Sequence, residues 1–211
     1  VNPYQRSPLS GQLSFRTVEP CKVEIEVQGK YPIKKEFPDF SDRHTIPVLG
    51  LYADKINTVT IKLTNEDGKV YNGEVKMETA PLPAFFPTIE IKKLDRSRME
   101  PGMHLIEQLI ANYGKFLTYT IIFDDHGDIR WFMDLSDMGQ IAYTALRIKS
   151  GNWLYLDWID LYEFSDLGQE IRHDQMWNYA GNHHMIELNN GNLLISGSGK
   201  DATVIRNGKP V

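Results

Sequence analysis

The stretch that decides the fold is Ser150-Gly151-Asn152-Trp153-Leu154-Tyr155-Leu156, because it recurs as Asn190-Gly191-Asn192-Leu193-Leu194-Ile195-Ser196. Gly151 and Gly191 lie 40 residues apart, and each stands between two apolar segments. A second turn repeats at nearly the same period, with glycines at 127, 168 and 208. Two tight turns in each unit of about 40 residues predict four strands per unit, which is the pattern of a β-propeller blade. Glycine turns can also fall at this interval by chance, but two independent series argue against it.

The repeats do not suffice for a closed propeller. Residues 89–211 hold two to three such units, whereas propellers close with about four to eight blades. The sequence also stops shortly after Gly208, in the turn before a further strand. We therefore expect a truncated propeller and a chain that is the N-terminal portion of a longer protein.

The first 80 residues have a different pattern. Apolar and polar residues alternate over 22–27 and again over 58–63, which is typical of half-buried strands. Asn65-Glu66-Asp67-Gly68 has the composition of a hairpin turn, and residues 70–77 read as the returning strand. Several short strands without a helical period predict a small antiparallel β-sandwich over residues 1–80.

A proline-rich connector follows the predicted sandwich. Residues 79–87 contain three prolines, which favour an extended, semi-rigid chain. We expect a linker over 81–88 between the sandwich domain, 1–80, and the propeller blades, 89–211. Residues 103–110 fit either a short helix or a strand, and the strand-rich context favours a strand. The sequence therefore predicts an all-β protein.

Composition argues against several classes of partner. The 211 residues include 23 Lys and Arg against 28 Asp and Glu, so the net charge is −5, and a pI of about 5.7 makes nucleic acid an unexpected partner. No run approaches the roughly 18 apolar residues of a membrane span.

The chain starts at Val1 without a signal peptide. Cys21 is the single cysteine, so no internal disulfide or cysteine metal cluster can form, and we expect it to be a buried strand residue.

The histidine pair His183-His184 is the strongest candidate for chemistry. It begins the innermost strand of a blade, eight residues ahead of Gly191, and such strands line the central channel of a propeller. Tyr143 stands 40 residues before His183 and is its equivalent in the repeat. The other four histidines have a solvated position or no obvious partner in the sequence: His44, His104, His126 and His173.

The residues alone leave the role of this pair open between a site and a packed or surface position. Adjacent strand residues point to opposite faces, so the two histidines cannot share a metal without a bulge, and no metal site is predicted. Hydrolase motifs of the G-x-S-x-G type and phosphate-binding glycine loops are missing from the sequence. Gly197-Ser198-Gly199-Lys200 follows a strand without a helix after it, so we expect an inter-strand loop there.

Four pieces of the sequence together resemble bacterial aryl-sulfate sulfotransferases. They are Asn2-Pro3-Tyr4 with Ser7-Pro8-Leu9; Pro47-Val48-Leu49-Gly50-Leu51-Tyr52; Gly127-Asp128-Ile129-Arg130-Trp131-Phe132-Met133-Asp134; and His183-His184-Met185-Ile186-Glu187 with Asn190-Gly191. The first two resemble the N-terminal Ig-like sandwich of that family and the last two its propeller. The resemblance runs through almost the whole chain in the same order.

This resemblance implies a six-bladed propeller behind the sandwich, in a protein exported to the periplasm or the cell surface. It implies transfer of a sulfuryl group from a phenolic sulfate ester to a phenol acceptor, by a ping-pong mechanism through a sulfated histidine and without a cofactor. His183 matches the family's first channel histidine, with a role in sulfate binding or in acid–base help to the leaving phenol. We assign His184 and Tyr143 to substrate binding.

The same resemblance places the nucleophilic histidine, a second supporting histidine, an arginine and a disulfide in later blades. We therefore expect residues 1–211 by themselves to be inactive, because the parts of such a site act as a unit. A homodimer is also expected. Two alternatives are a non-catalytic module that binds a protein or glycan through Trp153, Trp158 and Trp177, and a dimerisation fragment that pairs through the edge strands of the sandwich.

Overall fold

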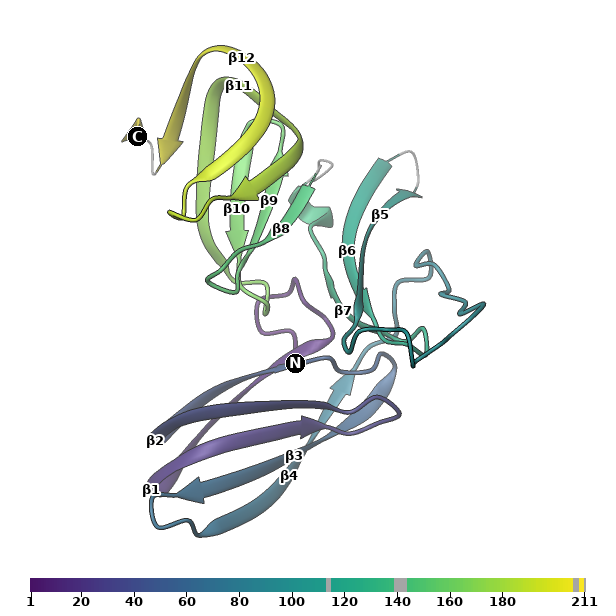
Figure 1. Ribbon diagram of the computed structural model, residues 1–211, viewed down its shortest axis with the longest axis vertical. Coiled ribbons are helices and arrows are strands. Elements are labelled where there is room, and N and C mark those ends of the chain that lie inside the picture. The colour runs from purple at the N-terminus through teal and green to yellow at the C-terminus, as the bar shows by residue number, and fades with distance from the viewer. Residues whose placement is uncertain (113–114, 139–143, 207–208, 211) are drawn as a thin grey trace. The chain divides into compact units, whose positions relative to one another are not determined.

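The chain is all-β in the computed structural model, which describes residues 1–112, 115–138, 144–206 and 209–210 (Figure 1). One 3₁₀ turn, Ser136–Met138, stands among thirteen described strands. No helix in this described part of the chain has the length and hydrophobicity that a membrane crossing requires. Contacts divide the chain into two compact units, 1–106 with 121–132, and 107–120 with 133–211.

The first unit contains a four-stranded antiparallel sheet in the order β2-β1-β3-β4. Its strands are β1 (Ser10–Val27), β2 (Ile33–Leu49), β3 (Lys55–Asn65) and β4 (Val70–Thr79). The start of β1 pairs with β2 alone, whereas its second half pairs with both β2 and β3. The register shifts between Arg16 and Cys21, around Pro20, so β1 and β2 bend there together.

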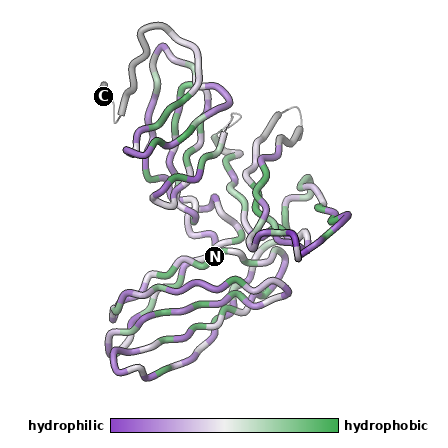
Figure 2. Tube along the Cα trace, viewed as in Figure 1, coloured by the Kyte–Doolittle hydropathy of each residue, from purple (hydrophilic) through white to green (hydrophobic). Residues whose placement is uncertain are grey.

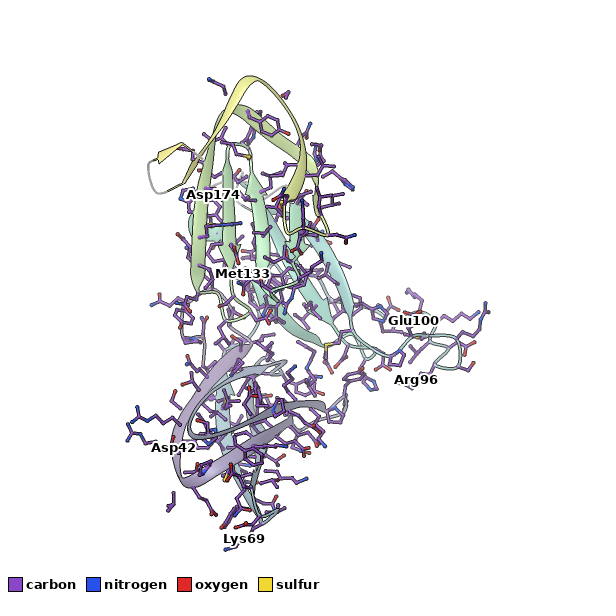
Figure 3. The ribbon with its side chains drawn as sticks, turned by 60° about the vertical axis from the view of Figure 1, so that its left-hand side comes forward. Asp42, Lys69, Arg96, Glu100, Met133 and Asp174 are labelled. Carbon is purple, nitrogen blue, oxygen red and sulfur yellow. The ribbon has the colours of Figure 1, made fainter. Side chains whose placement is uncertain are left out.

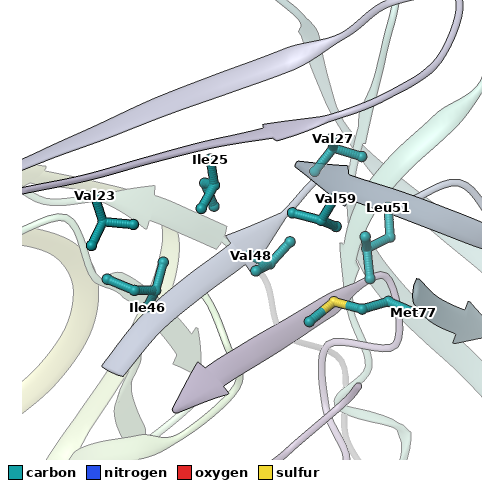
Figure 4. Close-up of a cluster of buried hydrophobic side chains, with 8 residues drawn as sticks. All are labelled: Val23, Ile25, Val27, Ile46, Val48, Leu51, Val59 and Met77. Atoms are coloured by element: carbon teal, nitrogen blue, oxygen red, sulfur yellow. The ribbon is translucent and has the colours of Figure 1, made fainter. Parts of the chain in front are cut away.

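The bend folds this sheet into two layers over one core. Val23, Ile25 and Val27 are buried on the inner face, as their alternation predicts. Hydrophobic and hydrophilic residues alternate along the strands of this sheet (Figure 2). Ile46 and Val48, from the half of β2 that pairs with the start of β1, belong to the same buried cluster (Figure 4). The cluster is completed by Leu51, Val59 and Met77. The predicted sandwich is therefore made by bent strands, and Cys21 is a buried free thiol within it.

A segment without strands follows β4. Residues 80–103 include Arg96 and Glu100 (Figure 3). The chain then enters a three-stranded sheet, β5 (His104–Asn112), β6 (Lys115–Phe123) and β7 (Ile129–Met133), in the order β5-β6-β7. The prediction of a strand over 103–110 is confirmed.

Three of the stretches that carried the family resemblance meet in the first unit. Arg130, in β7, is fully buried and pairs with the buried Asp124 at 2.8 Å. Its guanidinium donates to the carbonyl oxygens of Gly50 (2.7 and 3.0 Å) and Tyr31 (2.8 Å), and it lies 3.6 Å from the ring centroid of Tyr52. These contacts join the turn before β7 to the chain around the end of β2.

The N-terminal stretch joins the same region through backbone hydrogen bonds. The amide of Leu51 donates to the carbonyl oxygen of Leu9 (3.1 Å), and the side chain of Asn2 accepts from the amide of Ser7 (3.0 Å). The pieces that carry the resemblance in this part of the sequence are therefore linked to one another by hydrogen bonds.

The second unit contains a six-stranded antiparallel sheet in the order β13-β12-β11-β10-β9-β8. Its strands are β8 (Thr144–Arg147), β9 (Trp153–Asp157), β10 (Asp160–Phe164), β11 (Glu170–Glu187), β12 (Leu193–Arg206) and β13 (Lys209–Pro210). The predicted turn glycines at 127, 151, 168 and 191 all have φ between 83° and 89°. Gly208 lies outside the described residues.

The two repeat units are joined in one sheet and are not separate four-stranded sheets. β11 runs through both the last strand expected for the first unit and the first strand expected for the second. The prediction that residues 197–200 form an inter-strand loop is wrong, because Gly197 and Gly199 pair with β11 inside β12. A Cβ atom at Gly197 would lie 2.3 Å from the carbonyl oxygen of Ala180, so glycine permits this close crossing of the two strands.

Candidate histidine site

The histidine pair lies in a bulge of β11. Gly181 is paired with Gly197 and Met185 with Ile195, so four steps along β11 correspond to two along β12. His183 has φ of 22°, outside the extended region of a strand, and both His183 and His184 are exposed. The rule that neighbouring strand residues face opposite sides therefore does not apply to these two, because the structure has a bulge at this position.

The bulge is fixed from both neighbouring strands. The hydroxyl of Ser196 in β12 donates to the carbonyl oxygen of Asn182 (2.6 Å) and lies 3.3 Å from that of His184. On the other side, the amide of Gly181 donates to the carbonyl oxygen of Trp158 (2.6 Å). The backbone that carries the histidines is thus tied to β12 and to the hairpin between β9 and β10.

Gly181 packs closely against the core of the second unit. A Cβ atom there would lie 2.6 Å from a methyl carbon of Leu156 in β9. Leu156 belongs to the apolar core of the second unit, with Leu154, Leu161, Met176 and Met185. The start of the bulge therefore rests directly on the core, which limits the movement of the residues that follow it.

The hairpin next to the bulge has an unusual turn. Asp157 and Asp160 pair across it, so Trp158 and Ile159 form a two-residue connection. Trp158 has φ of 45°, a conformation that hairpins of this length ordinarily give to Gly, Asn or Asp. The side chains of Trp158 and Ile159 are 52% and 40% exposed.

Acidic side chains flank this turn. Asp160 lies 2.7 Å from Nε2 of His173, whose ring stacks on Tyr162 with the centroids 4.2 Å apart. His173 is exposed, as expected, but it has partners that the sequence did not indicate. Asp157 is buried, and its Oδ1 atom has no hydrogen-bond partner among the described residues. Burial, and secondly the negative charge of Asp160, raise the pKa of the Asp157 carboxyl from 3.8 to about 6.

This carboxyl makes stability depend on pH. Because its folded-state pKa is raised, the folded protein binds the proton more tightly than the unfolded chain, and stability falls as the pH rises from about 4 through about 6. Asp157→Asn should therefore stabilise the protein by about 2–3 kcal/mol above about pH 7 and change little near pH 4. Urea unfolding of both proteins across this range measures the difference. An equal difference at both ends of the range would contradict the assignment.

The other predicted residues are not gathered at the bulge. Tyr143 lies outside the described residues. His44 is buried in the first unit, where it stacks on Phe15 and where burial lowers its pKa. His104 stacks on Phe123, and His126 is exposed beside Asp125. Within the described part of the chain, no three His, Cys, Asp or Glu side chains are placed to hold a metal ion.

The three tryptophans of the alternative binding module do not form one exposed surface among the described side chains. Trp153 is buried and its indole N–H donates to Asp166 (2.8 Å), so it cannot display its ring to a partner. Trp158 is exposed, and the side chain of Trp177 is outside the described atoms.

Sequence reasoning missed the importance of Ser196 and of the Trp158 turn. The sequence did offer one signal for this turn. Trp158 and Ile159 are two bulky residues between Asp157 and Asp160, at a position where a tight turn ordinarily has glycine.

The bulge presents two exposed histidine side chains, His183 and His184. Exposed imidazoles donate hydrogen bonds to anionic oxygens, and histidine exchanges protons close to neutral pH. A backbone fixed on both sides reduces the cost of ordering them around a ligand. Oxygen-rich anionic groups are the ligands that such donors favour.

Two known protein-family models match the chain. The model of the arylsulfotransferase Ig-like domain matches residues 1–80, and that of arylsulfotransferase (ASST) matches residues 88–209. No curated protein matches the chain. Since the second match alone spans more than half of the 211 residues and the two follow each other in order, this chain belongs to the arylsulfotransferase family.

Proposed function

We propose that this chain is the N-terminal part of an enzyme that transfers a sulfuryl group from a phenolic sulfate ester to a phenol. The observation that carries the proposal is the exposed pair His183-His184 on a fixed bulge, within the segment that matches the arylsulfotransferase family. A binding module without catalysis is the alternative, but the burial of Trp153 removes one of its three expected contact residues.

The proposed reaction is a ping-pong transfer without a cofactor. In the first step a histidine nitrogen bonds to the sulfur as the bond from sulfur to the aryl oxygen breaks, and the departing phenolate takes up a proton. In the second step the oxygen of the acceptor phenol bonds to that sulfur and gives its proton to a base as the nitrogen–sulfur bond breaks, which frees the histidine. The nucleophile is assigned to a part of the protein beyond these residues.

The residues of this chain assist both steps in the proposal. His183 holds a sulfate oxygen or gives the leaving phenol its proton, and His184 and Tyr143 contribute to substrate binding. Because a transferring sulfuryl group carries charge on its oxygens, preorganised donors lower the barrier more than flexible ones. The hydrogen bonds of Ser196 and Gly181 around the bulge supply such preorganisation.

The proposed architecture comprises an Ig-like sandwich over 1–80, a linker over 81–88 and the first two to three blades of a six-bladed propeller over 89–211. The positions of the two family matches and the left-handed turn glycines about 40 residues apart support it. We also propose a homodimer in the periplasm or at the cell surface, as the family resemblance implies.

The function is tested by assaying the intact protein with 4-nitrophenyl sulfate and phenol. We expect release of 4-nitrophenol that depends on the acceptor, parallel double-reciprocal plots, and a sulfated histidine peptide when the acceptor is omitted. Residues 1–211 alone, as the control, should not turn over. Binding of the ester without any transfer by the intact protein would reject the enzymatic proposal and favour the binding module.

A further inference from the structure

The turn between β9 and β10 places a large aromatic side chain beside the histidine bulge. The carbonyl oxygen of Trp158 accepts the amide hydrogen of Gly181 at 2.6 Å, and that of Ile159 accepts the amide hydrogen of Met176, also at 2.6 Å. His183 follows Gly181 by two residues. Since successive Cα atoms are about 3.8 Å apart, the Cα atoms of Gly181 and His183 are separated by at most about 7.6 Å. The Trp158 backbone and the histidines are therefore close neighbours within the second unit.

The turn is unfavourable for folding in two ways. Trp158 adopts a left-handed φ of 45° that a bulky residue seldom takes, so the backbone is strained there. Its side chain and that of Ile159 also stay 52% and 40% exposed, so they forgo about half of the stabilisation that full burial would give. Glycine or asparagine would make the same turn without either cost. An unfavourable residue at an ordered position beside a candidate site indicates a role in binding.

The charges around the turn select the kind of ligand. Asp157 and Asp160 flank Trp158, so the charged side chains next to it in the turn are acidic, and Asp160 lies 2.7 Å from Nε2 of His173. The imidazoles of the bulge favour one. A ligand with an apolar ring at one end and an anionic group at the other fits both, with its ring at the indole and its anionic group at the histidines.

We propose that Trp158 binds the aromatic ring of the phenolic substrates by stacking, and so selects aryl over alkyl sulfate esters. This inference rests on the proposed function, because it assigns the aryl group of that reaction to a particular side chain. Aromatic rings stack favourably with centroids about 4.5–7 Å apart, and an indole offers a large face for this contact.

The test measures ring binding separately from catalysis. Binding of 2-naphthol, which carries no sulfate, is measured by calorimetry on the intact protein and on Trp158→Ala, Trp158→Phe and Trp158→Gly. We expect the alanine and glycine variants to bind about tenfold more weakly or worse, and the phenylalanine variant to stay within about threefold of the wild type. Ile171→Ala, which alters a side chain that is 50% exposed elsewhere on β11, is the matched control and should bind normally.

Two further readouts separate this inference from a structural role and from the proposed function. Trp158→Gly should melt no earlier than the wild type, because glycine removes the backbone strain. Wild-type 2-naphthol affinity in Trp158→Ala would overturn the inference even if sulfuryl transfer is observed. Loss of binding in that variant would support it even if the intact protein transfers no sulfuryl group. Loss of oligosaccharide binding with unchanged 2-naphthol binding would overturn it in favour of a glycan site.

Discussion

Replacing His183 with alanine in the intact protein is expected to lower kcat/KM for sulfuryl transfer by about 10²- to 10⁴-fold, the range typical of a positioned general acid or base. His183 lies on the bulge of β11, exposed and on a backbone that Ser196 and Trp158 hold from both sides. The loss should appear mainly in kcat, because the group acts most strongly as charge shifts in the transition state.

Folding should be preserved in this variant. The side chain is exposed, and alanine at φ of 22° meets a strain similar to that of histidine. His183→Asn, a residue that tolerates this conformation, is a second variant that should be equally inactive and at least as stable. Circular dichroism and the midpoint of urea unfolding check both.

Two other histidines serve as comparisons. His126→Ala changes an exposed histidine in the turn before β7 and should retain wild-type rates. His184→Ala should raise KM more than it lowers kcat, because we assign His184 to substrate binding. Wild-type turnover by His183→Ala, with the same assay intact for the controls, would remove His183 from the site.

Replacing Arg130 with methionine should destabilise the first unit by about 3–5 kcal/mol, because it leaves the carboxylate of Asp124 buried without its counter-charge. Both side chains of this pair are fully buried. The carbonyl oxygens of Gly50 and Tyr31 would also lose their donors. The free energy of urea unfolding of the variant against the wild type measures the effect.

Arg147 provides a matched control. It too combines a carboxylate partner, Asp166, with an aromatic ring, Trp153, but its side chain is 42% exposed. Arg147→Met should therefore cost at most about 1 kcal/mol. Adding Asp124→Leu to Arg130→Met should recover part of the loss, since it removes the uncompensated charge. Equal effects of Arg130→Met and Arg147→Met would contradict the role of the buried pair.

Much of the fold follows from local sequence. The period of two over 22–27 and 58–63, the turn at 65–68 and the glycines of the repeat predict strands and turns that the structure contains. These signals are local because alternation follows from strand geometry, and left-handed φ angles in tight turns from the lack of a Cβ atom in glycine. The sequence predicted units of four strands, but in the structure strands of both units belong to one six-stranded sheet. This could not be predicted locally, because β11 is one continuous strand that pairs with β10 on one side and with β12 on the other.

The candidate site was only half predictable. The sequence pointed to the two histidines because they begin the strand ahead of a repeated turn. It did not predict the bulge that carries them, because the bulge depends on how β11 pairs with β12. Nothing near residues 183 and 184 in the sequence indicates Ser196 or Trp158. Their contacts cross between strands whose relative position is fixed by packing.

The sequence by itself determined the all-β class, the repeat of about 40 residues and the pieces that resemble the family. Only the tertiary structure showed that Leu9, Gly50 and Arg130, each inside a different one of those pieces, lie in one hydrogen-bonded region. The physical reason is that a buried guanidinium must find acceptors for its donors wherever the chain supplies them. Here Gly50, 80 residues earlier in the chain, supplies one through its carbonyl oxygen.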